Sequence, residues 1–292
     1  MAFYKDENRA GAYCESGLSV PTYYITNALR EAGLSDAARL MEIGSGSGVL
    51  AEALRRKPLS ITCADYSHEM IGYFKQRLKK WCDDKITCAV LEAAASDTQQ
   101  RNNSHDALIL MNAIHWLLIS EEDTVNNRKE LQRILKSNAP VIAISTFPCI
   151  KPVEKITDSE TDPTAFWSFV QNELKTHDRF DRNCVTLLSH RNNNGRRGMM
   201  QNLTGNTDIR RLEVEKYELP LTLPAAVNRI ISLQPYQNIE REVIEDVCQR
   251  FLRSCNPQTR WLASGWIGRM PEKDFLQQEM IFPIVALAQV RS

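Results

Sequence analysis

Apolar positions in the first half of the chain follow two alternating patterns: short continuous runs, and longer segments with a helical period. The runs predict strands at 38–44, 60–66, 85–93, 105–112 and 139–147. The segments between them predict helices at 22–33, 48–57, 67–82 and 121–136. Strands that alternate with helices form a parallel sheet, and right-handed crossovers cover both of its faces. The pattern therefore predicts a doubly wound α/β fold.

Single residues refine these helices. Ser67 is suited to cap the helix that follows it, with Glu69 in the first turn, and Gly33 is expected to end the first helix. On the helix at 121–136, the apolar residues are spaced to form one inward face, made by Leu131, Ile134 and Leu135.

The second half of the chain has a less regular pattern. An aromatic helical piece at 163–175 precedes a polar, glycine-bearing stretch at 189–206, which we expect to be a mobile surface segment. Apolar alternation returns at 212–223 and 279–290, on either side of a helical stretch at 240–253. These two late strands would close the sheet as an antiparallel edge pair.

Together the patterns predict a single domain over residues 1–292. Its parts are amino-terminal cap helices (1–37), a ligand-binding core (38–147), a lid or substrate insertion (148–208), and closing strands with a helix (209–292). The fold class is a mostly parallel, seven-stranded, Rossmann-like sheet with an antiparallel closing strand and a helical lid.

Composition narrows the possible partners. Lys plus Arg equals Asp plus Glu at 36 each, so no global field favours a nucleic acid. Apolar stretches are too short to span a membrane, and the amino terminus lacks a secretory signal, so a cytoplasmic location is expected. The 8 cysteines form no C-x-x-C pair, which favours reduced structural thiols over a metal site. The oligomeric state is not readable from the sequence.

The stretch "LMEIGSGSGVL" places Gly44, Gly46 and Gly48 at the turn from a strand into a helix. Glycines there let a ligand lie against the backbone at the carboxyl edge of the sheet. A phosphate loop would need Lys followed by Ser or Thr, where this chain has Val49 and Leu50. A dinucleotide turn would place its third glycine one position later.

Two acids flank this turn. Glu42 stands two residues before Gly44, where its carboxylate would repel a pyrophosphate and attract a cationic amino group. Asp65 ends the second strand, where an acid can accept hydrogen bonds from both hydroxyls of a ribose. A ligand with a ribose, an ammonium group and no phosphate is S-adenosylmethionine.

The motifs "LMEIGSGSG", "ADYSHEM", "HDALILMNAIHWL" and "LQRILKSNAPVIAIS" resemble those of class I S-adenosylmethionine-dependent methyltransferases. They are most similar to the small-molecule branch that includes trans-aconitate and juvenile hormone acid methyltransferases. The resemblance implies a turn that contacts the methionyl part of the cofactor, supported by Glu42, with Asp65 on the ribose and Tyr66 beside the adenine. The turn residues in question are Gly44, Ser45, Gly46 and Gly48. No metal is implied.

The chain departs from the family after the third strand. Many relatives have an Asp-Ala pair there, whose carboxylate receives the adenine amino group. This chain has "EAAASD", so Ala94 replaces the acid, Ala95 offers its backbone, and Ser96 or Asp97 is the substitute we expect.

Asn112 and His115 follow the fourth strand, where the fold brings methyl donor and acceptor together. As catalytic residues, His115 would be a base or a hydrogen-bond donor, and Asn112 would also contact the cofactor. His115 could instead pack beside Trp116 and order the turn. Tyr13 could lie on the methyl donor or simply pack against the body of the protein.

The acceptor site has only weak candidates. Phe166 and Trp167 would line an apolar pocket if their helix is a lid, although an apolar helix face usually packs in a core. Arg196 and Arg197 would bind an anionic substrate, although solvated charge explains them equally well. Trp116 is the remaining candidate.

The expected function is methyl transfer from S-adenosylmethionine to a small molecule, leaving S-adenosylhomocysteine. A carboxylate or hydroxyl oxygen is the expected acceptor, ahead of nitrogen or carbon. "MNAIHW" lacks the Asn-Pro-Pro-Tyr type of run that many base methyltransferases carry after this strand. A protein that binds the cofactor but acts as a cyclase or as a non-catalytic binding module remains an alternative.

Overall fold

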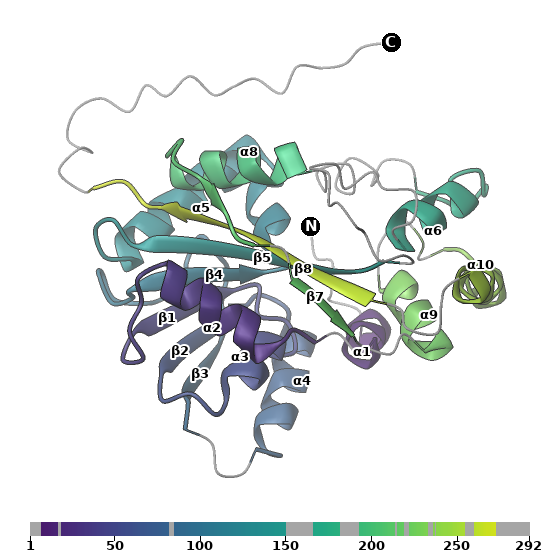
Figure 1. Cartoon of the computed structure of the whole chain (residues 1–292), viewed down its shortest axis with the longest axis horizontal. Coiled ribbons are helices and arrows are strands. Elements are labelled where there is room, and N and C mark those ends of the chain that lie inside the picture. Colours follow the sequence, from purple (N-terminus) through teal and green to yellow (C-terminus); the bar gives the residue numbers. More distant parts are fainter. Residues whose placement is uncertain are drawn as a thin grey trace.

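A computed structural model gives the fold of the chain (Figure 1). It describes residues 7–16, 19–81, 85–149, 166–181, 193–213, 215–218, 222–232, 236, 238–254 and 260–272. Among these residues, no helix combines the length and the apolar character needed to cross a membrane.

The sheet has five parallel strands, as the sequence predicts. They are β1 (Arg39–Ile43), β2 (Ser60–Asp65), β3 (Thr87–Glu92), β4 (Ala107–Met111) and β5 (Pro140–Cys149). The strand order begins β3-β2-β1-β4-β5, so β1 pairs with β2 on one side and with β4 on the other. The order reverses between β1 and β4. Ligands of open α/β sheets bind at this switch point, beyond the carboxyl ends of the strands.

The antiparallel edge was only partly predicted. β8 (Arg260–Arg269) pairs along the whole of β5, and the sequence pattern missed this strand. The stretch expected to be one strand at 212–223 instead contributes to two short ones, β6 (Arg210–Arg211) and β7 (Glu215–Glu218), which pair with successive parts of β8. They share one position at the edge, so the sheet is seven strands wide, as expected. The strand expected at 279–290 lies outside the described residues.

Helices cover both faces of this sheet, which confirms the doubly wound architecture. One face packs against α2 (Thr22–Glu31), α3 (Val49–Leu54) and α4 (His68–Leu78). The other face packs against a 3-10 helix, η1 (Ile114–Leu118), and against α5 (Glu121–Ile134).

The local signals read from the sequence act as expected in these helices. Ser67 Oγ accepts a hydrogen bond from Met70 N at 3.1 Å and so caps α4. Gly33 has a φ of 78°, in the left-handed region that glycine tolerates, where α2 ends. Leu131, Ile134 and Leu135 are fully buried.

Part of the segment expected to be mobile is a helix. α8 (Asn193–Thr204) packs against η1, α5 and β8 on the second face of the sheet. Its buried residues Met199, Met200 and Leu203 lie on one side of the helix and anchor it there. The expectation of a mobile surface segment is therefore wrong for these residues. The helix was not recognised in the sequence because its apolar face is short and is flanked by Asn, Arg and Gly.

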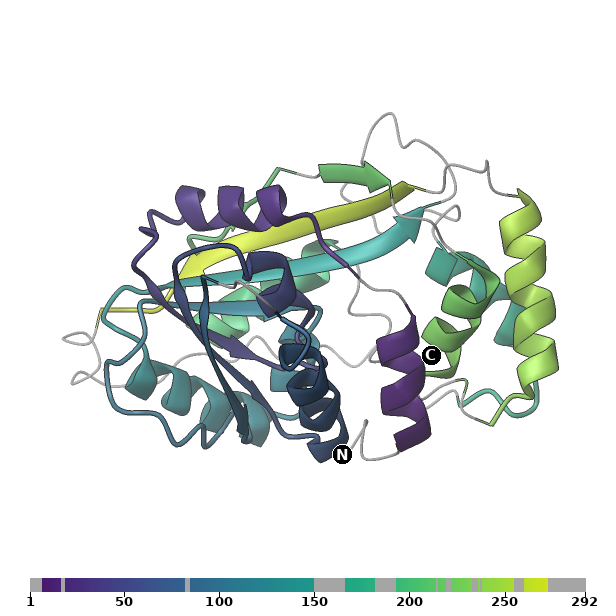
Figure 2. The same ribbon diagram turned by 90° about the horizontal axis from the view of Figure 1, so that it is seen from below.

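A separate group of helices lies beyond the end of β5, with its own apolar core (Figure 2). It consists of α6 (Phe166–Leu174), α9 (Leu223–Ile231) and α10 (Arg241–Ser254). Between this group and the sheet stands α1 (Glu7–Glu15), which contacts both α9 and α4. Asn228 Nδ2 donates to Glu15 Oε2 at 3.2 Å and links α9 to α1. The helical group therefore reaches the glycine turn through α1.

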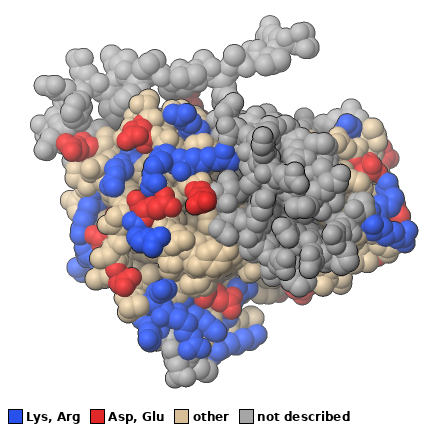
Figure 3. Space-filling view, in the orientation of Figure 1, with Lys and Arg blue, Asp and Glu red and all other residues tan. Residues whose placement is uncertain are grey.

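Charge is distributed unevenly over the surface. Figure 3 shows Lys and Arg gathered around the carboxyl end of α4, at the bottom of that view, with mixed charges elsewhere on the visible face. Lys75 and Arg77 stand in the last turn of α4, where they offset the partial negative charge of the helix end. Because α4 runs back from the carboxyl edge of the sheet, this basic surface lies at the edge opposite to the glycine turn.

Candidate functional site

The glycine turn depends on a left-handed backbone at three positions. Gly44, Gly46 and Gly48 have φ values of 70°, 53° and 82°. At two of them a side chain would also collide with a neighbour. A Cβ at Gly44 would lie 2.7 Å from Ala113 Cβ, and one at Gly48 would lie 2.3 Å from the ring of Phe74. Close packing beneath the turn therefore requires glycine at both positions.

Glu42 is the most unusual acid near the turn. It is 1% exposed on β1, and burial raises its pKa from 4.5 to about 8. Cys63 Sγ, on the neighbouring strand β2, donates to Glu42 Oε2 at 3.3 Å. The other oxygen, Oε1, has no hydrogen-bond partner among the described residues. Ser45 Oγ, which is also buried, shares that condition. Buried polar atoms left without partners are rare, and here they border a ligand-binding edge.

Asp65 links the second strand to the turn. Its Oδ2 accepts a hydrogen bond from Gly46 N at 2.8 Å, and its Oδ1 accepts one from Ser67 N at 2.9 Å. Burial raises the pKa of Asp65, and hydrogen bonds from backbone N–H groups oppose that rise. The backbone N–H of Tyr66 also hydrogen-bonds to this carboxylate, so these three donors use most of its about four acceptor positions and leave room for a further hydrogen bond. Asp65 can therefore hold the turn and still accept a hydrogen bond from a ligand.

The residues expected around an adenine lie at the same edge. Tyr66 follows Asp65 and is 39% exposed, which is unusual for a large aromatic side chain. Ala95 packs against the core of the second sheet face, whereas Ser96 and Asp97 are exposed. Asp97 N donates to Ala94 O at 3.1 Å, which makes a tight turn of this segment.

Asn112 has both ends of its amide engaged with β5. Its Nδ2 donates to Thr146 Oγ1 at 3.0 Å, and its Oδ1 accepts from Thr146 N at 2.9 Å. Its backbone has a φ of 54°, and its N–H donates to Ile144 O at 2.8 Å. The side chain thus joins the carboxyl ends of β4 and β5, a structural role that the sequence did not reveal.

His115 lies in η1, with its ring tilted by 45° against Trp116 and the ring centroids 4.5 Å apart. Both side chains are partly buried, and Trp116 packs against the second face of the sheet. The structure therefore contains the pairing with Trp116 that we set against a catalytic role. This ring contact and a catalytic role are compatible.

Tyr13, on α1, lies directly above the glycine turn. A Cβ placed on Gly46 would lie 3.7 Å from Tyr13 Cε1. Arg229, on α9, lies over the ring of this tyrosine, with its Cζ 5.4 Å from the ring centroid. Arg229 is only 7% exposed. Arg229 was not predicted from the sequence, because nothing near it in the chain indicates its contact with Tyr13.

The acceptor candidates are less well placed. The side chains of Phe166, Trp167 and Arg196 lie outside the described residues. Arg197 is exposed on α8, which packs on the second face of the sheet. Phe169, in the same helix as Phe166, packs against Phe251 with ring centroids 5.5 Å apart, so this part of α6 builds the core of the helical group.

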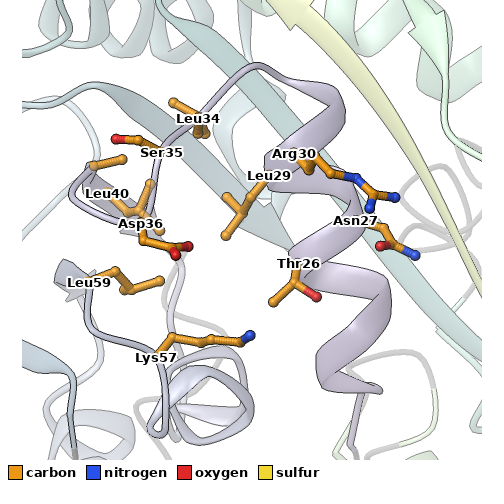
Figure 4. Close-up of a pocket in the computed structure, with 11 residues that line it drawn as sticks. Thr26, Asn27, Leu29, Arg30, Leu34, Ser35, Asp36, Leu40, Lys57 and Leu59 are labelled. Atoms are coloured by element: carbon orange, nitrogen blue, oxygen red, sulfur yellow. The ribbon is translucent and has the colours of Figure 1, made fainter.

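A pocket of about 360 Å³ lies elsewhere in the molecule (Figure 4). It is bordered by α2 and by the amino ends of β1 and β2, with Lys57, Asp36 and Arg30 among its lining residues. Because it opens at the amino edge of the sheet, it is separate from the glycine turn at the carboxyl edge.

Comparison with known proteins agrees with this placement of the site. Residues 41–143 match the family model described as a methyltransferase domain, a range that runs from β1 into β5 and contains the glycine turn. No curated protein matches the chain. The expected enzyme class, a methyltransferase that uses S-adenosylmethionine, is confirmed by this domain.

Solved structures of similar shape are distant in sequence. A putative type II methyltransferase from Anaeromyxobacter dehalogenans has 15% identity and a TM-score of 0.49, covering 87% of this chain and 98% of its own. The YcgJ protein of Bacillus subtilis has 14% identity and a TM-score of 0.48, covering 86% and 99%. A putative sarcosine dimethylglycine methyltransferase from Galdieria sulphuraria has 13% identity and a TM-score of 0.43, covering 86% and 85%. These sequence identities and TM-scores are too low to indicate a substrate.

Proposed function

We propose that this protein transfers the methyl group of S-adenosylmethionine to an oxygen atom of a small molecule, a carboxylate or a hydroxyl. The observation that carries the proposal is Glu42. A buried carboxyl group with one unpartnered oxygen, directly before a left-handed glycine turn, suits a ligand that brings its own ammonium group.

Each part of the cofactor has a matching group at the turn. The ammonium group would meet Glu42 Oε1, and Ser45 Oγ would accept or donate beside it. Asp65 would use its remaining acceptor position for the ribose while it holds Gly46 N. Tyr66 would supply an exposed aromatic face for the adenine. In place of the missing acid, the backbone of Ala95 and the side chain of Ser96 would receive the adenine amino group.

When bound, the cofactor supplies an electrophilic methyl group on a positively charged sulfur. The chain's own task is to hold the acceptor in line with that methyl group and to keep water away. Asn112 contributes by joining the ends of β4 and β5, which fixes the backbone that leads to His115. A carboxylate acceptor is already nucleophilic, so His115 would orient it, whereas a hydroxyl acceptor would need His115 as a base.

Calorimetry with S-adenosylhomocysteine tests the cofactor site. The wild type should bind, and Asp65→Ala should bind at least 10-fold more weakly, because a hydrogen bond to a charged group contributes about 1.5–3 kcal/mol. Glu122→Ala, which removes an exposed acid of α5, is the matched control. Undiminished binding by Asp65→Ala would contradict the ribose assignment, and no binding by the wild type would contradict the cofactor itself.

Ala94, which stands where many relatives have an acid, leaves one alternative open: a protein that keeps the cofactor site without transferring methyl groups. Incubation with methyl-labelled S-adenosylmethionine and a metabolite extract separates the two. A labelled small molecule supports transfer, and chromatography of hydrolysed and intact products then distinguishes an ester from an ether. Retained cofactor binding with no labelled product would support the binding module.

A further inference from the structure

Arg229 is a charged side chain in an environment where charges are rare. It belongs to α9, whose inward residues Ala226, Val227 and Ile230 build the core of the helical group. Arg229 is nevertheless 7% exposed, and it points to the side where α9 meets α1. Removing a guanidinium group from water is costly, so a buried arginine is normally matched to an anion or to hydrogen-bond acceptors.

Its neighbours direct this charge toward the cofactor site. The guanidinium carbon lies 5.4 Å from the centroid of the Tyr13 ring, a cation–π arrangement. The same ring also lies close to the turn, because a Cβ placed on Gly46 would be 3.7 Å from Tyr13 Cε1. Burial raises the pKa of Tyr13, Arg229 lowers it, and Asp65 raises it, so this phenol lies within electrostatic reach of both charged groups. Tyr13 therefore lies close to both Arg229 and the glycine turn.

The part of α9 that leads to Arg229 is anchored at two points. Asn228, the preceding residue, is 8% exposed and donates to Glu15 Oε2 on α1. Thr222 caps the start of α9 by accepting from Ala225 N at 3.3 Å. The backbone position of Arg229 beside Tyr13 therefore follows from the anchoring of α9 to α1.

We propose that Arg229 is a carboxylate-binding residue of the methyltransferase site, which rests on the function proposed above. A guanidinium group matches a carboxylate with two parallel hydrogen bonds, and a partly dry site strengthens them. The carboxylate can come from two sources. One is the aminoacyl end of the cofactor, whose ammonium group would lie at Glu42. The other is the acceptor itself.

This assignment changes the expectation for anionic substrates. The arginines first considered for that role stand at 196 and 197, and Arg197 is exposed on a helix that covers the sheet. Arg229 is buried beside Tyr13, which lies close to the turn, and it comes from a different helix, α9.

The test compares Arg229→Met and Arg229→Lys with wild type, using two ligands that share the adenosyl group. Calorimetry measures the affinities for S-adenosylhomocysteine and for 5′-methylthioadenosine, which lacks the aminoacyl end with its ammonium group and its carboxylate. If Arg229 binds the cofactor carboxylate, Arg229→Met weakens S-adenosylhomocysteine binding by about 10- to 100-fold and leaves 5′-methylthioadenosine unchanged. Arg229→Lys keeps the charge but cannot form the two parallel hydrogen bonds. Its affinity for S-adenosylhomocysteine should therefore lie between those of wild type and Arg229→Met.

If the carboxylate belongs to the acceptor, both adenosyl ligands bind the variants as they bind wild type. In that case, protein saturated with S-adenosylhomocysteine is titrated with hexanoate and benzoate, and with the corresponding amides as uncharged partners. Wild type should prefer the carboxylates, and Arg229→Met should lose that preference. Arg211→Met is the matched control, because Arg211 also lies over an aromatic ring, 5.8 Å from the Trp266 centroid, but at the far edge of the sheet.

A variant that fails to fold would also lose binding. Urea denaturation of each variant therefore tests for a cooperative fold, and Arg229→Lys provides a second, more conservative variant. If wild type binds S-adenosylhomocysteine and every affinity survives in a folded Arg229→Met, the carboxylate inference is overturned while the proposed function stands. If wild type binds no adenosyl ligand, the proposed function is overturned and the inference falls with it.

Discussion

Replacing Glu42 by glutamine should make the stability of the ligand-free protein less sensitive to pH. The carboxyl group is 1% exposed, and burial raises its pKa from 4.5 to about 8. Between these pH values the folded protein keeps a proton that the unfolded chain releases. Stability therefore falls as pH rises from about 4.5 to about 8, and glutamine, which has no such proton, abolishes this part of the dependence.

The size of the effect follows from the same interval. From pH 4.5 to pH 7, at about 1.4 kcal/mol per pH unit, the wild type loses about 3 kcal/mol that the variant keeps. A buried amide that lacks partners has its own cost, but that cost is constant with pH. The difference in the free energy of unfolding between Glu42→Gln and wild type should therefore move by about 3 kcal/mol in favour of glutamine over this range.

Urea denaturation at several pH values from 4.5 to 8 measures this difference, with Glu122→Gln, an exposed acid of α5, as the control. Cofactor binding should change in the opposite sense. Wild type should bind S-adenosylhomocysteine more tightly as pH approaches 8, because the ammonium group needs an ionised carboxylate, and Glu42→Gln should bind about 10- to 100-fold more weakly. Parallel stability curves for the two proteins would refute the reasoning about Glu42.

Further changes test the supports of the site. Gly48→Ala should destabilise the fold by about 2–5 kcal/mol and Gly33→Ala by about 1–2 kcal/mol in urea denaturation, because both need a left-handed φ but only the first collides with a ring; equal losses would contradict the packing argument. Thr146→Val should cost about 1–3 kcal/mol and lower kcat more than it raises the cofactor KM, since Asn112 loses an acceptor; unchanged kcat would leave the amide with a purely structural role. Glu130→Gln should lower the free energy of unfolding by about 1–3 kcal/mol, because Thr98 N and Oγ1 both donate to this carboxylate; an unchanged urea midpoint would exclude that contribution.

The parallel half of the sheet could be predicted because each of its elements carries its own signal. β2 is an apolar run that ends in an acid, and the helix behind it begins with Ser67, a capping residue whose side chain does accept the hydrogen bond. Such signals lie within a few residues of one another, so a single sequence suffices to read them.

An antiparallel edge was predicted, but its main strand, β8, was missed because the signal for it lies in distant partners. β8 contains Gly265 and Gly268, which interrupt its apolar alternation. A Cβ at Gly265 would lie 2.9 Å from Ala143 O and 2.6 Å from Leu212 Cδ1, so glycine is required by the strands on both sides. The residues next to Gly265 in the sequence do not indicate those contacts. Because the glycines break the apolar alternation, the pattern does not predict a strand here.

The candidate site divides in the same way. Glu42 could be found because a carboxyl group at the end of an apolar run is conspicuous, and its unusual pKa follows from the burial that such a run implies. Arg229 could not be found, because its meaning comes from a tyrosine on another helix, and that helix comes from the opposite end of the chain. Residues that act through long-range contacts need the structure.

Asn112 can have both a structural role and a role in binding ligands. Its place at the end of β4 suggested a reactive or ligand-binding amide. In the structure, the left-handed φ of 54° and the paired hydrogen bonds to Thr146 already account for asparagine, which tolerates that backbone better than other side chains. The amide still has a second N–H and a free lone pair on its oxygen, so a ligand contact would add to the structural role. A residue held this firmly at the switch point of the sheet is well suited to position a reacting pair, because it cannot yield when the ligand binds.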